Sequence, residues 1–250
     1  MLGSLFHAIL YQPIFNVLIA LYNLIPDFGV ALIVLTILLR LALFPLSQKS
    51  IKSQKELSEI QPEIKKLQQQ YKDDKQKQAQ ALMELYKEKK VNPMSGCLPL
   101  LVQLPILIAL YQVCLNVFKP DAFSALYSFV SNPGQVNPMF FGFIDLSLRN
   151  IPLAVLAGLA QFWQTKMILP KTDNNKSKTT KTGGMAEQMS GMMNKQMLYF
   201  MPVLTVIIGF SLPGGLPLYW LVTTLLTVGQ QYLPWGKKDK KKISNGVKNN

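Results

Sequence analysis

The chain has 250 residues, 49% of them apolar, and a formal net charge of +13. The apolar residues gather in runs of about eighteen or more, the length of helix that crosses a ~30 Å hydrocarbon layer. This segregation excludes a soluble globular domain and predicts an all-α multi-pass membrane protein. The two cysteines, Cys97 and Cys114, share one apolar run at a spacing that fits no metal or redox motif, so we expect no metal site and no cofactor.

Residues 1–27 are predicted to form an amphipathic helix. Apolar side chains recur at helical spacing, the opposite side carries uncharged polar residues, and Pro13 should bend the helix. We expect this helix to lie at the extracytoplasmic membrane interface, with a full span as the alternative. The segment contains no Lys or Arg, so it lacks the positively charged start of a secretory signal.

Four longer apolar blocks follow. The last is too long for one span, and it is interrupted by SLPGGLP, a cluster of Pro and Gly that predicts a turn between two helices. The result is a core of five transmembrane helices, at residues 28–46, 97–118, 151–169, 197–212 and 216–233. The fourth is short, which indicates a locally thin bilayer or shielding by neighbouring helices.

The segment 47–93, between the first two spans, is highly charged, with eleven lysines and seven acidic residues. Apolar residues nevertheless recur every three or four positions, first around Ile60 and Ile64 and again, after the KDDK turn, around Leu82 and Tyr86. This spacing predicts two amphipathic helices packed as a hairpin outside the membrane. The alternative is a solvated charged loop.

The positive charges predict the orientation, because loops rich in Lys and Arg stay on the cytoplasmic side. The segments 47–93, 170–196 and 234–250 together carry twenty-two lysines, whereas 1–27 carries no Lys or Arg and 119–150 carries two. We therefore place the hairpin, the 170–196 loop and the basic tail in the cytoplasm. The N-terminus and the 119–150 loop are then extracytoplasmic.

One permanent charge, Arg40, lies inside the first span, about 9 Å from its cytoplasmic end. An arginine at mid-bilayer costs about 2.5–3.5 kcal/mol, and the spans contain no Asp or Glu that would offset it. They offer uncharged polar side chains instead, namely Thr36, Gln103, Gln112, Asn116, Gln161, Gln164, Thr165, Thr205, Ser211, Thr223, Thr224 and Gln230. We infer a hydrated, positively charged recess that opens to the cytoplasm and attracts an acidic or polar guest. Snorkelling of Arg40 to the lipid headgroups is the alternative.

Three stretches resemble a known family: LLRLALFPL around Arg40, ELYKEKKVNPMSGCLPLLVQLPI after the hairpin, and MLYFMPVLTVIIGFSLPGGLPLYWLVTTLLTVGQQYL near the C-terminus. They are similar to the YidC family of membrane protein insertases, and the resemblance runs from about Pro26 to Pro234. It implies a five-span core, a cytoplasmic hairpin and a groove with one arginine in the inner half of the bilayer. Arg40 matches that arginine, and Gln161 and Trp220 match polar and aromatic groove residues. The short segment before the first span resembles the compact bacterial type without a large extracytoplasmic domain.

Together, the residues and the resemblance predict an insertase and chaperone of the bacterial cell membrane that carries out no covalent chemistry. Its expected partners are nascent membrane proteins and the lipid bilayer, with the ribosome and the Sec translocon as further candidates and no role for DNA. A channel or transporter, or an assembly scaffold without a groove, remains the alternative function.

The predicted site has three parts. The substrate groove would be lined by Arg40, Gln103, Gln112, Asn116, Gln161, Gln164, Thr205, Trp220 and Thr224. The hairpin would offer clients apolar contacts through Met83 and Tyr86. The tail would contact ribosomal RNA or anionic lipid through Lys237, Lys238, Lys240, Lys241 and Lys242.

Overall fold

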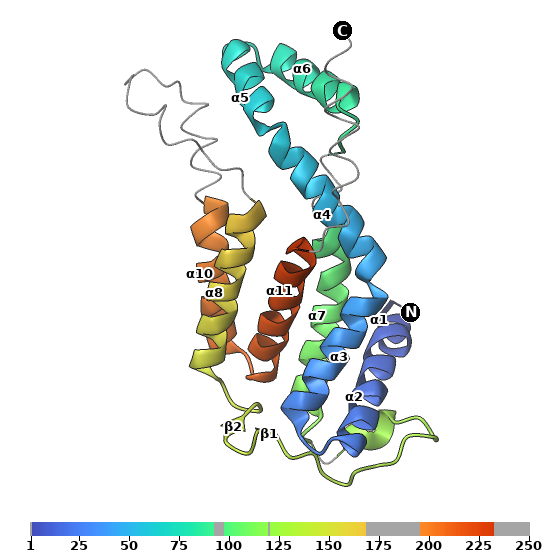
Figure 1. The fold of residues 1–250 in the computed structure, drawn as a ribbon. Coiled ribbons are helices and arrows are strands. Elements are labelled where there is room, and N and C mark those ends of the chain that lie inside the picture. Colours follow the sequence, from blue (N-terminus) through green and yellow to red (C-terminus); the bar gives the residue numbers. More distant parts are fainter. Residues whose placement is uncertain (1, 93–97, 120, 169–195, 233–250) are drawn as a thin grey trace.

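The computed structural model describes residues 2–92, 98–119, 121–168 and 196–232 and is mostly helical, as predicted (Figure 1). Its elements in chain order are α1 (Leu2–Phe6), the π-helical turn η1 (His7–Tyr11), α2 (Gln12–Leu24), α3 (Phe28–Ala42), α4 (Phe44–Glu59), α5 (Gln61–Gln70), α6 (Lys75–Glu88), α7 (Leu98–Asn116), the 3-10 turn η3 (Ala122–Ala125), β1 (Met139–Phe140), β2 (Ile144–Asp145), α8 (Ile151–Ile168), the π-helical turn η5 (Gln196–Phe200), α10 (Met201–Ser211) and α11 (Gly215–Tyr232). The two short strands pair antiparallel.

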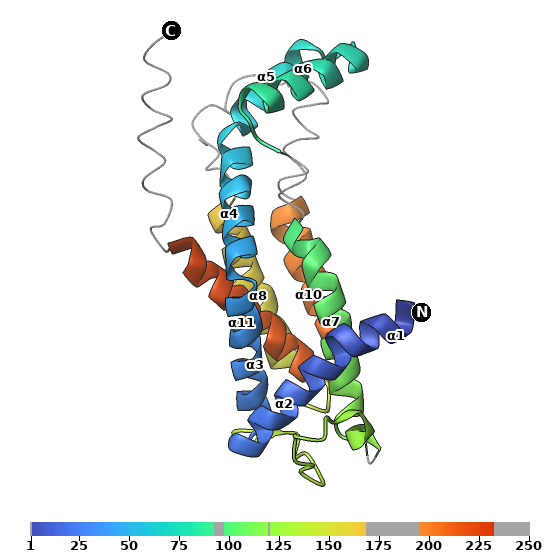
Figure 2. The same ribbon diagram turned by 90° about the vertical axis from the view of Figure 1, so that its right-hand side faces the viewer.

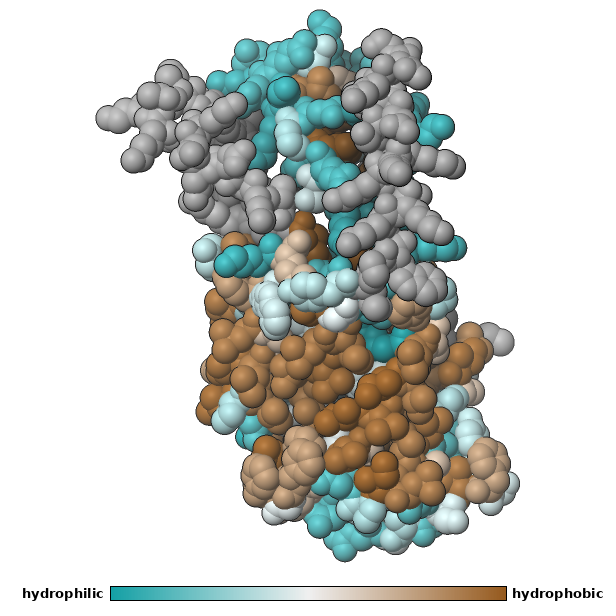
Figure 3. Space-filling model, viewed as in Figure 1, coloured by the Kyte–Doolittle hydropathy of each residue, from teal (hydrophilic) through white to brown (hydrophobic). Residues whose placement is uncertain are grey.

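The longer helices form a bundle in which α11 is central (Figures 1 and 2). It packs against both α8 and α3, while α8 also packs against α10 and α2 packs against α3 and α7. The face shown in Figure 3 is apolar over the middle of the bundle and polar toward both ends. An exposed apolar surface this broad is unusual for a soluble protein and suits a lipid environment.

Helix length gives a separate view of membrane crossing. Among the described residues, Gly3–Leu24 is long and apolar enough to cross a membrane, and the bent pair α3 and α4 counts as a second such segment if it forms one span. The helical segments Leu101–Asn116 and Leu198–Ser211 are apolar but shorter. The core of five transmembrane helices therefore stays a prediction.

The N-terminal helix contributes to the core of the bundle. Phe15 and Leu18 of α2 are fully buried together with Phe28 of α3 and Leu110 of α7. Pro13 lies in the first turn of α2, where a missing backbone N–H is tolerated, and the π-helical turn η1 lies directly before it. The helix thus passes the proline without a break.

The first predicted span, 28–46, is divided between two helices. α3 ends at Ala42, and α4 begins at Phe44 with an axis bent by 69° from that of α3. Pro45 lies in the first turn of α4 and has no N–H to continue the hydrogen bonding of α3, which accounts for the break. α4 then runs out of the bundle to Glu59, so it carries the chain from the apolar belt to the charged end.

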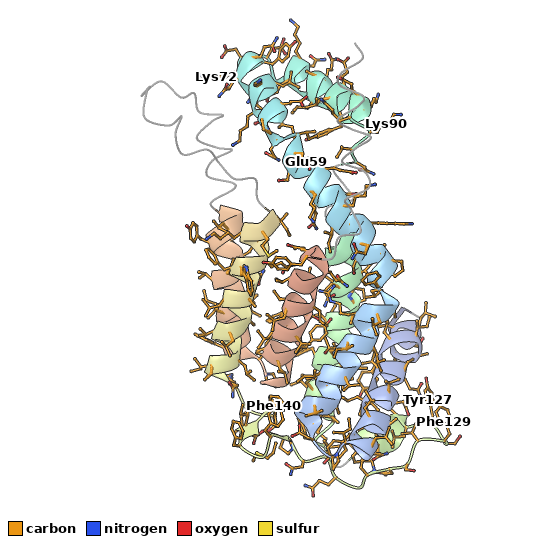
Figure 4. The ribbon with its side chains drawn as sticks, viewed as in Figure 1. Glu59, Lys72, Lys90, Tyr127, Phe129 and Phe140 are labelled. Atoms are coloured by element: carbon orange, nitrogen blue, oxygen red, sulfur yellow. The ribbon has the colours of Figure 1, made fainter. Side chains whose placement is uncertain are left out.

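Beyond α4 the chain folds back on itself, with Lys72 at the turn and Lys90 just after the second arm (Figure 4). α5 and α6 pack against each other. Their shared apolar core consists of Ile60, Ile64, Leu85 and Val91. A salt bridge of 2.9 Å between Lys89 and Glu63 also joins the arms. Asp74 caps α6 by accepting a hydrogen bond from the Lys77 backbone N–H at 3.0 Å, and this bond lowers the pKa of Asp74.

The segment between α7 and α8, described for residues 117–119 and 121–150, covers the end of the bundle opposite the hairpin, and we call it the cap. Asn16 of α2, which is buried, donates to the Ala125 carbonyl at 3.0 Å and accepts from the Tyr127 N–H at 2.6 Å. The Tyr22 hydroxyl accepts from the Asn137 N–H at 2.9 Å. Polar residues of the N-terminal helix are therefore partners of this cap.

The cap is also fastened to the start of α3 and to the turn before α11. Asp27 accepts hydrogen bonds from the N–H of Val30 at 2.9 Å, which caps α3, and from the N–H of Phe141 at 2.7 Å. The Gly214 N–H donates to the Leu148 carbonyl at 2.8 Å. The SLPGGLP turn is thus held against the cap.

Phe140 of the cap packs directly on Gly29 of α3. A Cβ at position 29 would lie 2.1 Å from Cδ2 of the Phe140 ring, far inside van der Waals contact. Gly29→Ala is expected to lower the free energy of unfolding by about 1–3 kcal/mol, the usual cost of overpacking. Thermal unfolding in lipid nanodiscs, followed by circular dichroism, would measure the loss.

The control for this prediction is a double-mutant cycle with Phe140→Ala. Removing the ring removes the two closest contacts, with Cδ2 and Cγ, but leaves Cβ of residue 140 at 2.7 Å from the new Cβ. Gly29→Ala should therefore cost less in the Phe140→Ala background than in the wild type. Equal costs in the two backgrounds would show that the close approach of Phe140 does not limit residue 29.

Candidate functional site

Arg40 lies in the last turn of α3 and is half-buried. Its Nη2 donates to the Thr223 carbonyl oxygen at 2.8 Å and to the Thr227 hydroxyl, both on α11. The Thr227 hydroxyl itself donates to the same Thr223 carbonyl at 2.8 Å. One nitrogen of the guanidinium is therefore held by neutral acceptors of the central helix.

These acceptors belong to a row of polar residues that recur every fourth position and so follow one side of the helix. We call this row the α11 stripe, and its members, all buried, are Tyr219, Thr223, Thr227 and Gln231. Gln103 of α7 donates to the Tyr219 hydroxyl, and Lys55 of α4 donates to the Gln231 carbonyl at 3.5 Å. The α11 stripe thus receives hydrogen bonds from α3, α4 and α7.

Several buried polar atoms on α3, α4 and α11 are left without partners. In the described part of the chain, Nε of Arg40, Nε2 of Gln48, Oε1 of Gln230 and Nε2 of Gln231 make no hydrogen bond. A buried polar group without a partner costs about 1–3 kcal/mol, and ordered water commonly satisfies such groups. These helices therefore present polar atoms suited to water or to a polar guest.

A second polar contact joins α8 to α10. The Thr205 hydroxyl donates to Oε1 of Gln161, and the Gln161 carbonyl accepts from the Thr165 hydroxyl at 2.9 Å. Both Gln161 and Thr205 are among the predicted groove residues. No hydrogen bond found between the described residues connects this pair to Arg40, so the predicted polar residues fall into separate groups.

The other predicted groove residues differ in position. Thr224 is buried on α11, and Trp220 is half-buried against the apolar core. Gln112 on α7 and Gln164 on α8 are half-buried.

Asn116 lies at the capped end of α7, where its side chain accepts from Lys119 at 2.8 Å. It is thirteen residues beyond Gln103, which corresponds to about 20 Å along a helix. Gln103 contacts the α11 stripe, so Asn116 lies well away from that contact.

The predicted client and tail residues lie outside the bundle or outside the described chain. Met83 of α6 is exposed, whereas Tyr86 packs against the apolar core of the hairpin. The tail lysines Lys237, Lys238, Lys240, Lys241 and Lys242 lie outside the described residues. Within the described part of the chain, no group of three or more His, Cys, Asp or Glu is placed to hold a metal.

Thr227, like Tyr219 and Gln231, is a site residue that the sequence did not predict. A lone Thr in an apolar helix carries little information, because its hydroxyl usually bonds to a carbonyl of its own helix. The available signal was the four-residue spacing from Tyr219 to Gln231, which predicts that Thr227 shares a side of the helix with Thr223.

The fold and the site define a helical membrane-type bundle with an apolar belt, a charged hairpin at one end and an arginine held by an uncharged polar helix. The chain belongs to the family described as 60Kd inner membrane protein, whose sequence profile matches residues 20–241. The predicted resemblance is thereby confirmed, and membership supports a location in a bacterial membrane.

Individual relatives agree with this assignment. Over 224 residues the chain is 36% identical to proteins named membrane protein insertase YidC from Francisella tularensis subsp. novicida (strain U112) and subsp. tularensis (strain WY96-3418), a match that covers 89% of this chain and 35% of each relative. A crystal structure described as active YidC insertase with the first transmembrane domain resolved matches with a TM-score of 0.55 and 27% identity, over 89% of this chain and 46% of that one. The chain thus spans about a third of the length of these curated relatives.

Proposed function

We propose that this chain is a membrane protein insertase that guides nascent membrane proteins into the bilayer through a hydrated recess bordered by α3, α4 and α11. The observation that carries the proposal is the set of unpaired polar atoms, with Nε of Arg40 and Nε2 of Gln231 among them, inside a bundle with an apolar belt. Hydrocarbon offers such atoms no partner, whereas water or a polar guest does.

The recess would lower the cost of moving a polar tail across the membrane. An unsatisfied polar group in hydrocarbon costs several kcal/mol, and a wet passage avoids much of that cost. Arg40 would attract an acidic group on the tail, because one side of its guanidinium is held by Thr223 and Thr227 while Nε is unpaired. The apolar helix of the client then leaves into lipid, a step favoured by about 25 cal/mol for each Å² of apolar surface removed from water.

The predicted topology is part of this proposal. Five helices span the membrane, α5 and α6 form a cytoplasmic hairpin, and the cap between α7 and α8 lies outside. The lysine-rich hairpin and the apolar belt of Figure 3 support this orientation. We propose that α2 lies on the extracytoplasmic side, because Asn16 and Tyr22 bond to the cap; by its length, Gly3–Leu24 also suits a full span.

The partners follow from the same scheme. The hairpin would receive clients through the exposed Met83, a flexible side chain that adapts to varied apolar partners. The basic tail would contact ribosomal RNA or anionic lipid, and the Sec translocon is a further candidate partner. No covalent bond changes, so the activity is that of a chaperone.

Reconstitution tests the proposal. The purified chain is placed in liposomes, a labelled single-span client with a short acidic tail is added during synthesis, and insertion is read as protection from external protease. We expect protection well above that of empty liposomes. Protection equal to empty liposomes would overturn the proposal, and rapid flux of small solutes without insertion would favour a channel.

A further inference from the structure

The cap between α7 and α8 carries two sets of apolar side chains. One set faces inward: Phe140 is 8% exposed, Val136 is 3% exposed and Leu146 is fully buried. The other set is largely exposed: Phe129 by 81%, Phe143 by 75%, Phe141 by 63% and Leu148 by 63%. The exposed set therefore does not contribute to the packing of the cap against the bundle.

The outward residues stand on a backbone that is fixed to the bundle. Asn16 holds the N–H of Tyr127, two residues before Phe129, and the Asp27 carboxylate holds the N–H of Phe141 itself. The Leu148 carbonyl accepts from Gly214. Hydrogen bonds from three parts of the bundle thus fix the backbone that carries or adjoins these side chains.

The exposed residues lie on more than one side of the bundle. Figure 4 shows Phe129 and Tyr127 at one side of the capped end and Phe140, which is followed by Phe141, at the other. In Figure 3 the apolar surface continues down toward this end, and polar surface covers the tip. Phe and Leu side chains on the apolar face of an interfacial segment typically lie about 5–10 Å deep, at the boundary between headgroups and acyl chains.

We propose that Phe129, Phe141, Phe143 and Leu148 insert into the headgroup region of the adjacent lipid leaflet and anchor the capped end of the bundle there. The occupant of this surface is phospholipid, because the surface continues the apolar belt. Lys119 and Arg149, both exposed, stand at the two ends of the cap and provide positive charge for lipid phosphate. The proposal concerns only the partner of this surface, so it holds whether or not the recess at Arg40 inserts clients.

Site-directed spin labelling tests the anchor. Phe129→Cys and Phe143→Cys are made singly in a Cys97→Ser, Cys114→Ala background, labelled with a nitroxide and reconstituted in liposomes. Gln135→Cys is the matched control, because Gln135 is an exposed polar residue of the same cap. Collision rates with oxygen, which partitions into lipid, and with a water-soluble nickel chelate are then compared.

We expect the labels at 129 and 143 to collide more often with oxygen than with the nickel chelate, and the label at 135 to show the reverse. Labels at 129 and 143 that are as open to the nickel chelate as residue 135 would overturn the anchor. Labels shielded from both reagents would indicate a covering protein and would overturn it as well. Leu148→Cys repeats the test at an independent position should either Phe variant fail to fold.

Discussion

Arg40→Glu is expected to abolish insertion of clients with an acidic tail, and Arg40→Lys is expected to retain part of the activity. The substitution by Glu replaces attraction with repulsion at the same position, whereas Lys keeps the charge but loses the planar fork of the guanidinium. Insertion by Arg40→Ala should fall between that of the two other variants. Removal of a charge-assisted hydrogen bond worth about 1.5–3 kcal/mol should lower insertion about tenfold or more. Protease protection of a labelled client in liposomes measures all three variants.

A client with a neutral tail provides the control for the charge. If Arg40 acts by electrostatic attraction, Arg40→Glu should affect the neutral-tailed client much less than the acidic one. Full activity of Arg40→Ala toward both clients would show that the charge is not used. Equal loss for both clients would instead indicate damage to the bundle.

Thr227→Val should weaken insertion of the acidic-tailed client, while Thr227→Ser should leave it close to the wild-type level. Val keeps the shape of Thr but removes the hydroxyl that accepts from Nη2 of Arg40 and donates to the Thr223 carbonyl. A hydrogen bond to a charged group is worth about 1.5–3 kcal/mol, so insertion should fall by about tenfold or more. The same protease-protection assay, with the two clients run in parallel, gives the ratio of acidic to neutral insertion.

Thr36→Val is the matched control for Thr227→Val. Thr36 is also buried and lies on the same helix as Arg40, but its hydroxyl donates to the Leu32 carbonyl of its own helix at 2.7 Å. Its replacement should leave the acidic-to-neutral ratio unchanged. A similar fall in that ratio for Thr36→Val would show that any buried hydroxyl matters, and that holding Arg40 is not the specific role of Thr227.

The helices could be predicted from the sequence, because the spacing of apolar residues and the positions of proline are visible within a short stretch of chain. The block of 197–212 corresponds to η5 and α10, and the Pro and Gly of SLPGGLP mark the point where α10 ends and α11 begins. The spacing around Ile64 and Leu82 likewise describes the surfaces through which α5 and α6 meet. Pro45, which has no N–H, is the residue in the sequence that indicates the division of 28–46 into two helices.

The same patterns do not predict contacts between residues that are far apart in the sequence. Asn16 is one of the uncharged polar residues of the predicted N-terminal helix, and it bonds to backbone groups more than a hundred residues away. A helical periodicity shows that a polar residue lies on one side of a helix, but it does not show what that side meets. The pairing of Arg40 with Thr227, at a separation of 187 residues, was hidden for the same reason.

Water at the α11 stripe is the central claim, and thiol labelling measures it most directly. Thr223→Cys and, as a control, Val228→Cys are compared in the background without native cysteines; both positions are buried on α11, one polar and one apolar. A charged thiol reagent needs a hydrated, ionised thiol to react. With the reagent added on the hairpin side of the membrane, we predict fast modification of the thiol at position 223 and slow modification of the thiol at position 228. Equally slow reaction at both positions would show that the region around Arg40 is dry and would contradict the proposed route.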